Sequence, residues 1–185
     1  PQELEKITGL KLSMRQLMYM VGVSPVVKLE VAKEAAMWAM FDKAEKDSGY
    51  QHKTGTVGAI NYRKYTFTMP EAELDLVVSV NNGWSTIVLT SSKLDAANLS
   101  IALGATKPAQ SVVSSGKLKE LSTKYQLNNE SFGYISSQEL VKALNSKDGN
   151  QLAKDVETLF GAEAGVALAS WREPACQTDS NAIAA

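Results

Sequence analysis

His52 is the only histidine of this 185-residue chain, and Cys176 is its only cysteine. Zinc sites and Cys–His catalytic pairs draw on several such side chains, so the sequence is short of ligands for either. A serine hydrolase would need His52 as its general base, and the chain has no Gly-x-Ser-x-Gly motif to supply the nucleophile. We therefore predict no catalytic residue and no metal site, and we interpret His52 as a solvent-facing loop side chain.

Two motifs that could bind phosphate or calcium match only in part. At Gly116-Lys117, Ser111 and Leu118 stand where a phosphate-binding loop requires Gly and Ser or Thr. A calcium loop with Gly149 as its sixth residue would place Leu144 at the first ligand position, which leucine cannot fill. We therefore predict no cofactor.

Aromatic and basic residues alternate between positions 61 and 67, a pattern that can stack on and neutralise a single-stranded nucleic acid. On a regular strand, however, Tyr65, Phe67 and Met69 share one face, because side chains alternate. We expect this trio to pack under a helix while Tyr62 and Lys64 face water. The 19 Lys and Arg residues balance 20 Asp and Glu residues, so we predict no nucleic-acid partner.

Five apolar side chains form the candidate ligand-binding set. Met37, Met40 and Phe41 lie on a predicted helix, and Tyr65 and Phe67 lie on a predicted strand. Methionine adapts to varied apolar ligands but also fills cores. A cleft between this helix and the sheet would hold a small apolar ligand or a lipid, and the alternative is that the five side chains are simply core.

Hydrophobic spacing predicts the elements that position these side chains. Apolar residues at helical spacing predict a helix over 33–47 that ends at Gly49, and a shorter first helix ends at Gly9. Two extended segments, 18–23 and 26–31, are interrupted at Ser24-Pro25, because proline lacks a ladder donor.

In the second extended segment, alternation predicts which side chains face the core. Val27, Leu29 and Val31 should point inward, with Lys28 and Glu30 outward.

Two hairpins follow, of which the second has the clearer signal. Residues 53–57 and 62–69 form the first, with a turn near 58–61. In the second, Asn82-Gly83 supplies a type I′ turn. Counting back from that turn pairs Val78 with Ile87 and Leu76 with Leu89 on one face, which is consistent because cross-strand partners share a face.

The second half of the sequence is predicted to be mostly helical. Helices are expected at 94–103, after Ser114-Ser115, after a strand at 132–135 with a capping box from Ser136 to Glu139, and after Asn150. The stretch 161–169 has no clear period and carries no prediction.

These elements predict an α+β fold, with an antiparallel sheet of about four or five strands, helices packed on one face and a helical C-terminal extension. The strand at 26–31 and the strand at 132–135 each lead into a helix. We therefore divide the chain into an α/β unit with two hairpins, 1–130, and a helical segment, 131–185, which would open a second similar unit.

The sequence has no transmembrane segment, since no run approaches the ~20 apolar residues required, and its start lacks the order of a signal peptide. It begins at Pro1 and stops after Ile183-Ala184-Ala185. We expect a fragment of a longer protein, from which Cys176 has lost a partner or in which it is a free thiol.

Three stretches, 21–31, 58–65 and 132–135 with the helix that follows, resemble uncharacterised bacterial envelope proteins and lipoproteins that repeat an α/β unit. The resemblance implies export, a periplasmic or outer-membrane-associated location and a lipid anchor upstream of Pro1, and it implies no reaction. A cytoplasmic location remains the alternative, because an exported Cys176 would be expected to find a partner.

Three hypotheses of function follow. The first is a non-enzymatic cell-envelope binding or structural module, whose partner is an unknown protein or ligand. The second is a periplasmic carrier of a small apolar ligand or lipid. The third is a fragment of an enzyme whose site lies outside this chain.

Overall fold

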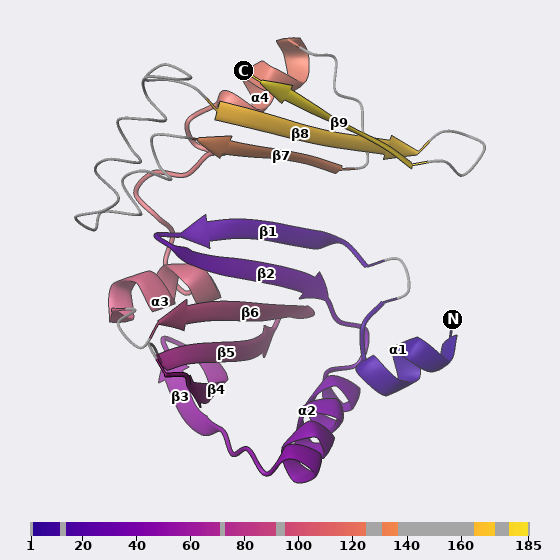
Figure 1. The fold of residues 1–185 in the computed structure, drawn as a ribbon, viewed down its shortest axis with the longest axis vertical. Helices are drawn as coiled ribbons and strands as arrows, with labels where there is room; N and C mark the ends of the chain where they lie inside the picture. Colours follow the sequence, from indigo (N-terminus) through magenta and orange to yellow (C-terminus); the bar gives the residue numbers. More distant parts are fainter. Residues whose placement is uncertain are drawn as a thin grey trace. The chain divides into compact units, whose positions relative to one another are not determined.

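The chain divides into two compact units, Pro1–Lys107 and Pro108–Ala185, each with its own sheet (Figure 1). The sequence pattern, by contrast, suggests a division after residue 130. The computed structural model describes residues 2–11, 14–70, 73–91, 95–124, 131–136, 165–172 and 178–184.

The first unit is built on a six-stranded antiparallel sheet in the order β1-β2-β6-β5-β4-β3. Its strands are β1 (Gln16–Val21), β2 (Ser24–Glu30), β3 (Lys53–Val57), β4 (Ile60–Thr68), β5 (Glu73–Asn81) and β6 (Trp84–Ser91). The expected four or five strands are too few. The chain turns at Gly22, which has φ 58°, so Ser24 and Pro25 begin β2 and do not interrupt it.

The β5–β6 hairpin confirms the predicted turn and register. Asn82 and Gly83 both have positive φ, 51° and 75°, as a type I′ turn requires. Val78 pairs with Ile87, and Leu76 pairs with Leu89. The β3–β4 hairpin also forms, and its turn is at Gly58 and Ala59.

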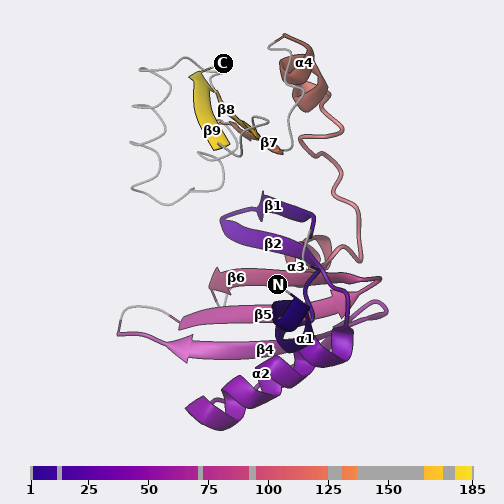
Figure 2. The ribbon, with the colours of Figure 1, turned by 90° about the vertical axis from the view of Figure 1, so that its right-hand side faces the viewer.

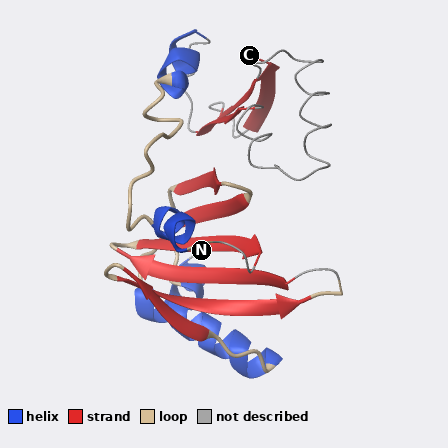
Figure 3. Cartoon of the chain, turned by 90° about the vertical axis from the view of Figure 1, so that its left-hand side faces the viewer, coloured by secondary structure: helices blue, strands red, loops and turns tan. Residues whose placement is uncertain are grey.

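Helices cover both faces of this sheet, whereas the sequence predicted helices on one. The helices of the first unit are α1 (Gln2–Thr8), α2 (Glu34–Ser48) and α3 (Ala96–Leu103). Helix α2 ends at Gly49 and α1 before Gly9, as predicted, while α3 is capped by Asp95. Figure 2 draws α2 on the near side of the strands, and Figure 3 shows the opposite side.

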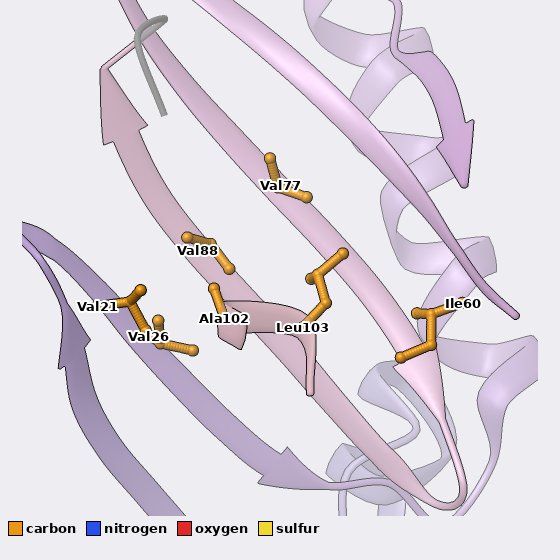
Figure 4. Close-up of a cluster of buried hydrophobic side chains, with 7 residues drawn as sticks. All are labelled: Val21, Val26, Ile60, Val77, Val88, Ala102 and Leu103. Atoms are coloured by element: carbon orange, nitrogen blue, oxygen red, sulfur yellow. The ribbon is translucent and has the colours of Figure 1, made fainter. Parts of the chain in front are cut away.

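The two faces hold separate clusters, because successive residues of a strand point to opposite sides. Val77 contributes to the cluster under α3, and Val78 contributes to the cluster under α2. The α3 cluster, drawn in Figure 4, consists of Val21, Val26, Ile60, Val77, Val88, Ala102 and Leu103. The α2 cluster consists of Val31, Met37, Tyr65 and Val78. Helices α2 and α3 therefore each cover part of one face of a single sheet.

Strand β2 differs from its predicted facing because both of its faces are covered. Val26 is fully buried under α3, so that this strand has apolar contacts on both faces. Glu30 is buried, 6% exposed, and does not face outward. Its carboxylate accepts hydrogen bonds from the Arg15 backbone at 3.0 Å and from the Lys11 ammonium at 3.3 Å. The basic partners of buried Glu30 lie in the segment before β1. The alternation of side chains along β2 could not identify them, because it describes β2 alone.

The second unit contains helix α4 (Lys117–Lys124) and a three-stranded antiparallel sheet in the order β7-β8-β9. Strand β7 (Ser131–Ser136) confirms the strand predicted at 132–135, and α4 confirms the helix predicted after Ser114-Ser115. Beyond β7, the described residues form β8 (Gly165–Arg172) and β9 (Thr178–Ala184), whereas a helical extension was predicted there. Pairing between segments distant in sequence determines these strands, which local spacing does not reveal. The helices predicted after Ser136 and Asn150 lie outside the described residues.

Candidate functional site

Several charged and aromatic side chains of the first unit meet between α2 and β4. Asp42 and Glu45 lie one turn apart on α2, and Arg63 and Tyr65 lie two residues apart on β4, so each pair shares a face. Arg63 Nη1 is 2.5 Å from Asp42 Oδ1 and 3.3 Å from Glu45 Oε1. With His52, these side chains form what we name the Glu45 cluster.

Glu45 is the common acceptor of this cluster. Its Oε1 accepts a hydrogen bond from the Tyr65 hydroxyl at 2.6 Å and lies 2.8 Å from His52 Nδ1. The imidazole is also 5.9 Å from the Tyr65 ring, between centroids. His52 is therefore not the solvent-facing loop residue expected, because its side chain is 24% exposed and is held against the helix by Glu45.

Burial and hydrogen bonding together set the protonation of the cluster. Burial acts to raise the pKa of Glu45, but the hydrogen bonds from Tyr65 and His52 and the charges of His52 and Arg63 outweigh it, so this pKa is lowered. Burial, followed by the hydrogen bond to Glu45, raises the pKa of Tyr65 to about 12. Glu45 is therefore ionised and Tyr65 neutral at neutral pH.

A hollow of about 600 Å³ opens beside this cluster, between the first half of α2 and the β3–β4 hairpin. Arg63 belongs to both, since it pairs with the cluster and also lines the hollow. We name this depression the α2–β4 hollow. Its lining residues are Glu34, Trp38, Thr54, Gly55, Thr56, Ala59, Ile60, Asn61, Tyr62, Arg63, Val80 and Asn81.

Trp38 is the large aromatic side chain that α2 supplies to the hollow. The Arg63 guanidinium carbon lies 4.5 Å from the centroid of the Trp38 ring, within the range of a cation–π contact. The indole Nε1 donates a hydrogen bond to Glu34 Oε1 at 3.1 Å. On the strand side, the Thr56 hydroxyl donates to Asn61 Oδ1 at 3.0 Å. The wall of the hollow is therefore ordered by its own polar contacts.

Two of the five side chains predicted to bind a ligand belong to the α2 cluster, and two more pack against it. Met37 and Tyr65 are buried at 2% and 5% exposure, and Phe41 and Phe67 pack against them. Met40 is half-buried on the same helix. None of the five lines the α2–β4 hollow. Met37, Phe41, Tyr65 and Phe67 are instead part of the hydrophobic core under α2.

The aromatic and basic strand is also rearranged relative to its prediction. Tyr65 and Phe67 pack under α2 as expected, but Met69 is exposed at 46%. Tyr62 packs against the α3 cluster and does not face water. Lys64 forms an ion pair with buried Asp75 at 3.2 Å. The reason is that α3 covers the face that a one-sided sheet would leave open to water.

The pairing of Glu45 with Arg63 was not predicted from the sequence. A signal was present, because Glu45 lies four residues after Phe41 on the apolar stripe of the helix, and Arg63 shares the face of Tyr65. The helix stripe and the strand face are both predicted to be buried, so opposite charges on them, here Glu45 and Arg63, should be expected to pair. Among the residues that the structure describes, no three His, Cys, Asp or Glu side chains gather as a metal ion would require.

The helices that the structure describes are each too short or too polar to span a membrane. Comparisons with protein-family models, curated proteins and solved structures found no match.

Proposed function

We propose that this chain is a non-enzymatic binding module of the cell envelope, and that it holds a small polar molecule in the α2–β4 hollow. The observation that carries the proposal is the hollow itself. Its volume of about 600 Å³ is within the range of small-molecule sites. Its wall combines the indole of Trp38 with hydroxyl, amide and charged groups, which orient a polar ligand.

The arrangement of the charged groups favours binding over catalysis. Glu45 already accepts hydrogen bonds from the cluster, and Arg63 is already paired with Asp42 and Glu45. A general base or an electrophile must instead remain available to a substrate. Groups that satisfy one another are suited to keeping Trp38 and β4 in a constant geometry.

A thermal-shift screen tests this function. A ligand that binds only the folded protein raises its stability by about 2.7 kcal/mol at one hundred times Kd. We expect at least one class among sugars, polyols, amino acids, amines and nucleosides to stabilise the parent protein, and to stabilise the Thr54→Val variant less.

Thr68→Val is the matched control, because Thr68 is an exposed residue of β4 that does not line the hollow. Equal stabilisation of all three proteins would reject the hollow as the site. Catalytic turnover that disappears in a single side-chain variant would reject the non-enzymatic function.

The envelope location rests on the resemblance of three stretches to bacterial envelope proteins and lipoproteins. This part of the proposal includes periplasmic or outer-membrane association and a lipid anchor upstream of Pro1. Fractionation of the full-length protein in its host tests this part separately. Recovery of the protein in the cytoplasmic fraction would reject the envelope location and would leave the proposed binding function untouched.

A second candidate function, the carrier of a small apolar ligand or lipid, is favoured by another surface. Met18, Met20 and Leu89 are 74%, 53% and 41% exposed. Their cross-strand pairing places them on the α2 face of the sheet, on β1 and β6. Native mass spectrometry of protein from its host should detect a retained lipid if the carrier function holds. A ligand-free mass that matches the chain would reject it.

A further inference from the structure

The charges around the α2–β4 hollow disfavour an anionic ligand. Among the described residues that line it, Arg63 is the one basic side chain. Its guanidinium is already engaged by Asp42 at 2.5 Å and Glu45 at 3.3 Å. Glu34 adds a further carboxylate to the wall. A phosphate or carboxylate ligand would therefore meet the carboxylate of Glu34 and a base whose charge Asp42 and Glu45 already balance.

The remaining polar groups of the wall are of the kind that both donate and accept hydrogen bonds. Thr54 and Thr56 supply hydroxyls, and Asn61 and Asn81 supply amides. Thr56 and Asn61 pair with each other at 3.0 Å, so an apolar ligand would leave mainly Thr54 and Asn81 unpaired, at a cost of about 1–3 kcal/mol for each that it buries. A ligand with several hydroxyl groups can instead pair with them.

Trp38 adds an aromatic ring to these hydrogen-bonding groups, and because the Arg63 guanidinium lies over one face of that ring at 4.5 Å, a ligand would use the other face or the edge. The face of an indole carries partial negative charge, so it attracts polarised C–H groups as well as cations. Contacts with Arg63 and Glu34 hold the ring in place, which reduces the entropy that binding would cost. A pyranose ring presents C–H groups on one face and hydroxyl groups around its rim.

From this combination we infer that the ligand of the α2–β4 hollow is a neutral sugar, a pyranose or a short oligosaccharide. The inference rests on the proposed function and names its ligand class. The ring would lie against the wall that contains Trp38. Its hydroxyl groups would pair with Asn61, Thr54 and Glu34.

Tryptophan fluorescence tests the inference directly. Trp84→Phe and Trp171→Phe together leave Trp38 as the only indole of the three. This protein is titrated with glucose, galactose, N-acetylglucosamine and their disaccharides, and separately with putrescine, glycine and inorganic phosphate. We expect a saturable change with at least one sugar and none with phosphate.

Variants of the hollow then locate the binding. Thr54→Val and Asn61→Leu should each raise Kd for that sugar at least tenfold, and Thr68→Val should leave it unchanged. Both hollow variants replace exposed side chains, and circular dichroism checks that each is folded. Should one fail to fold, the other carries the comparison.

The possible outcomes distinguish the class of the ligand from the location of its binding site. If putrescine or glycine binds and Thr54→Val weakens it, the hollow is a binding site and the sugar inference is overturned. If a sugar binds the parent and Thr54→Val equally, the sugar inference is overturned, because that binding lies elsewhere. If no probe binds, both the inference and the small-molecule function are rejected.

Discussion

Glu45 joins a helix, a strand and a loop through one carboxylate. Its Oε1 contacts Tyr65 and Arg63 of β4 and His52 of the segment after α2. A partly buried carboxylate is stabilised only when such partners compensate for its desolvation. The consequence is that the protonation of Tyr65 reports on the integrity of the cluster.

Replacing Glu45 with glutamine should lower the pKa of Tyr65 from about 12 while leaving it above the ordinary value of 10. Burial remains in the variant, but the negative charge that disfavours the tyrosinate is removed. Ultraviolet absorbance of tyrosinate during a pH titration measures this change. Tyr65→Phe identifies which transition belongs to Tyr65, and an unchanged transition in Glu45→Gln would contradict the contact.

The same replacement should also reduce stability. Hydrogen bonds to charged groups contribute more than those between neutral groups, so we expect a loss of about 1–3 kcal/mol in the free energy of unfolding. Urea denaturation at neutral pH measures it, and a loss well under that range would mean that solvent already satisfies Glu45.

Glu30 should make the folded state sensitive to acid. Hydrogen bonds from the Arg15 side chain and backbone, and from Lys11, outweigh the effect of burial and lower its pKa from 4.5 to about 2. A lowered pKa in the folded state means that the stability it contributes is complete above pH 4.5 and is lost as pH falls toward 2. Urea midpoints measured across this range should fall.

Two variants check that this sensitivity comes from Glu30. Glu30→Gln should have a flatter pH dependence between 4.5 and 2 and a lower stability at neutral pH. Arg15→Ala should move the loss to higher pH, because the main partner of the carboxylate is removed. If all three proteins have parallel pH profiles, Glu30 is not the responsible group.

At the scale of elements, one glycine lets α1 approach the start of α2. Gly9 has φ 72°, and its carbonyl accepts hydrogen bonds from the backbone of Ala32 and Lys33. A Cβ at this position would lie 2.3 Å from the Lys33 carbonyl oxygen. Glycine is required here both for its conformation and for its size.

Gly9→Ala should therefore destabilise the protein more than an alanine placed at another positive-φ glycine. Gly22→Ala is the matched variant, because Gly22 has φ 58° and a Cβ there would meet no other part of the chain within 4 Å. We expect a loss of roughly 1–2 kcal/mol for Gly22→Ala from conformation alone. For Gly9→Ala we expect about 3 kcal/mol or more, since a backbone clash is added. Equal losses in urea denaturation would show that the clash is relieved.

At the scale of the whole molecule, the chain is two units with separate sheets. The first contains both hydrophobic clusters, α2, α3, the Glu45 cluster and the α2–β4 hollow. A unit with its own core is expected to fold by itself.

A protein that ends at Lys107 should therefore unfold in one cooperative transition, with a free energy of about 5–15 kcal/mol. Circular dichroism during urea denaturation measures this. The absence of a cooperative transition in this shorter protein would mean that the first unit depends on residues 108–185.

Sequence alone determined the elements whose signals are local. The β5–β6 register follows from Asn82-Gly83, and the end of α2 follows from Gly49, because a positive φ favours these residues. The α+β class and the antiparallel pairing of the hairpins follow from such signals. Of the candidate ligand set Met37, Met40, Phe41, Tyr65 and Phe67, all but Met40 pack together between α2 and the sheet, and ligand binding by the set stays a prediction.

Tertiary structure decided what depends on contacts between distant residues. It placed α3 on the second face of the sheet, paired β2 with β6 and made strands of residues 165–172 and 178–184. It also joined Glu45 to Arg63 and Tyr65 across a separation of about twenty residues. The physical reason is that hydrogen bonds between strands and charges under a helix are satisfied by partners that the three-dimensional path of the chain brings near, and neighbours in sequence do not specify them.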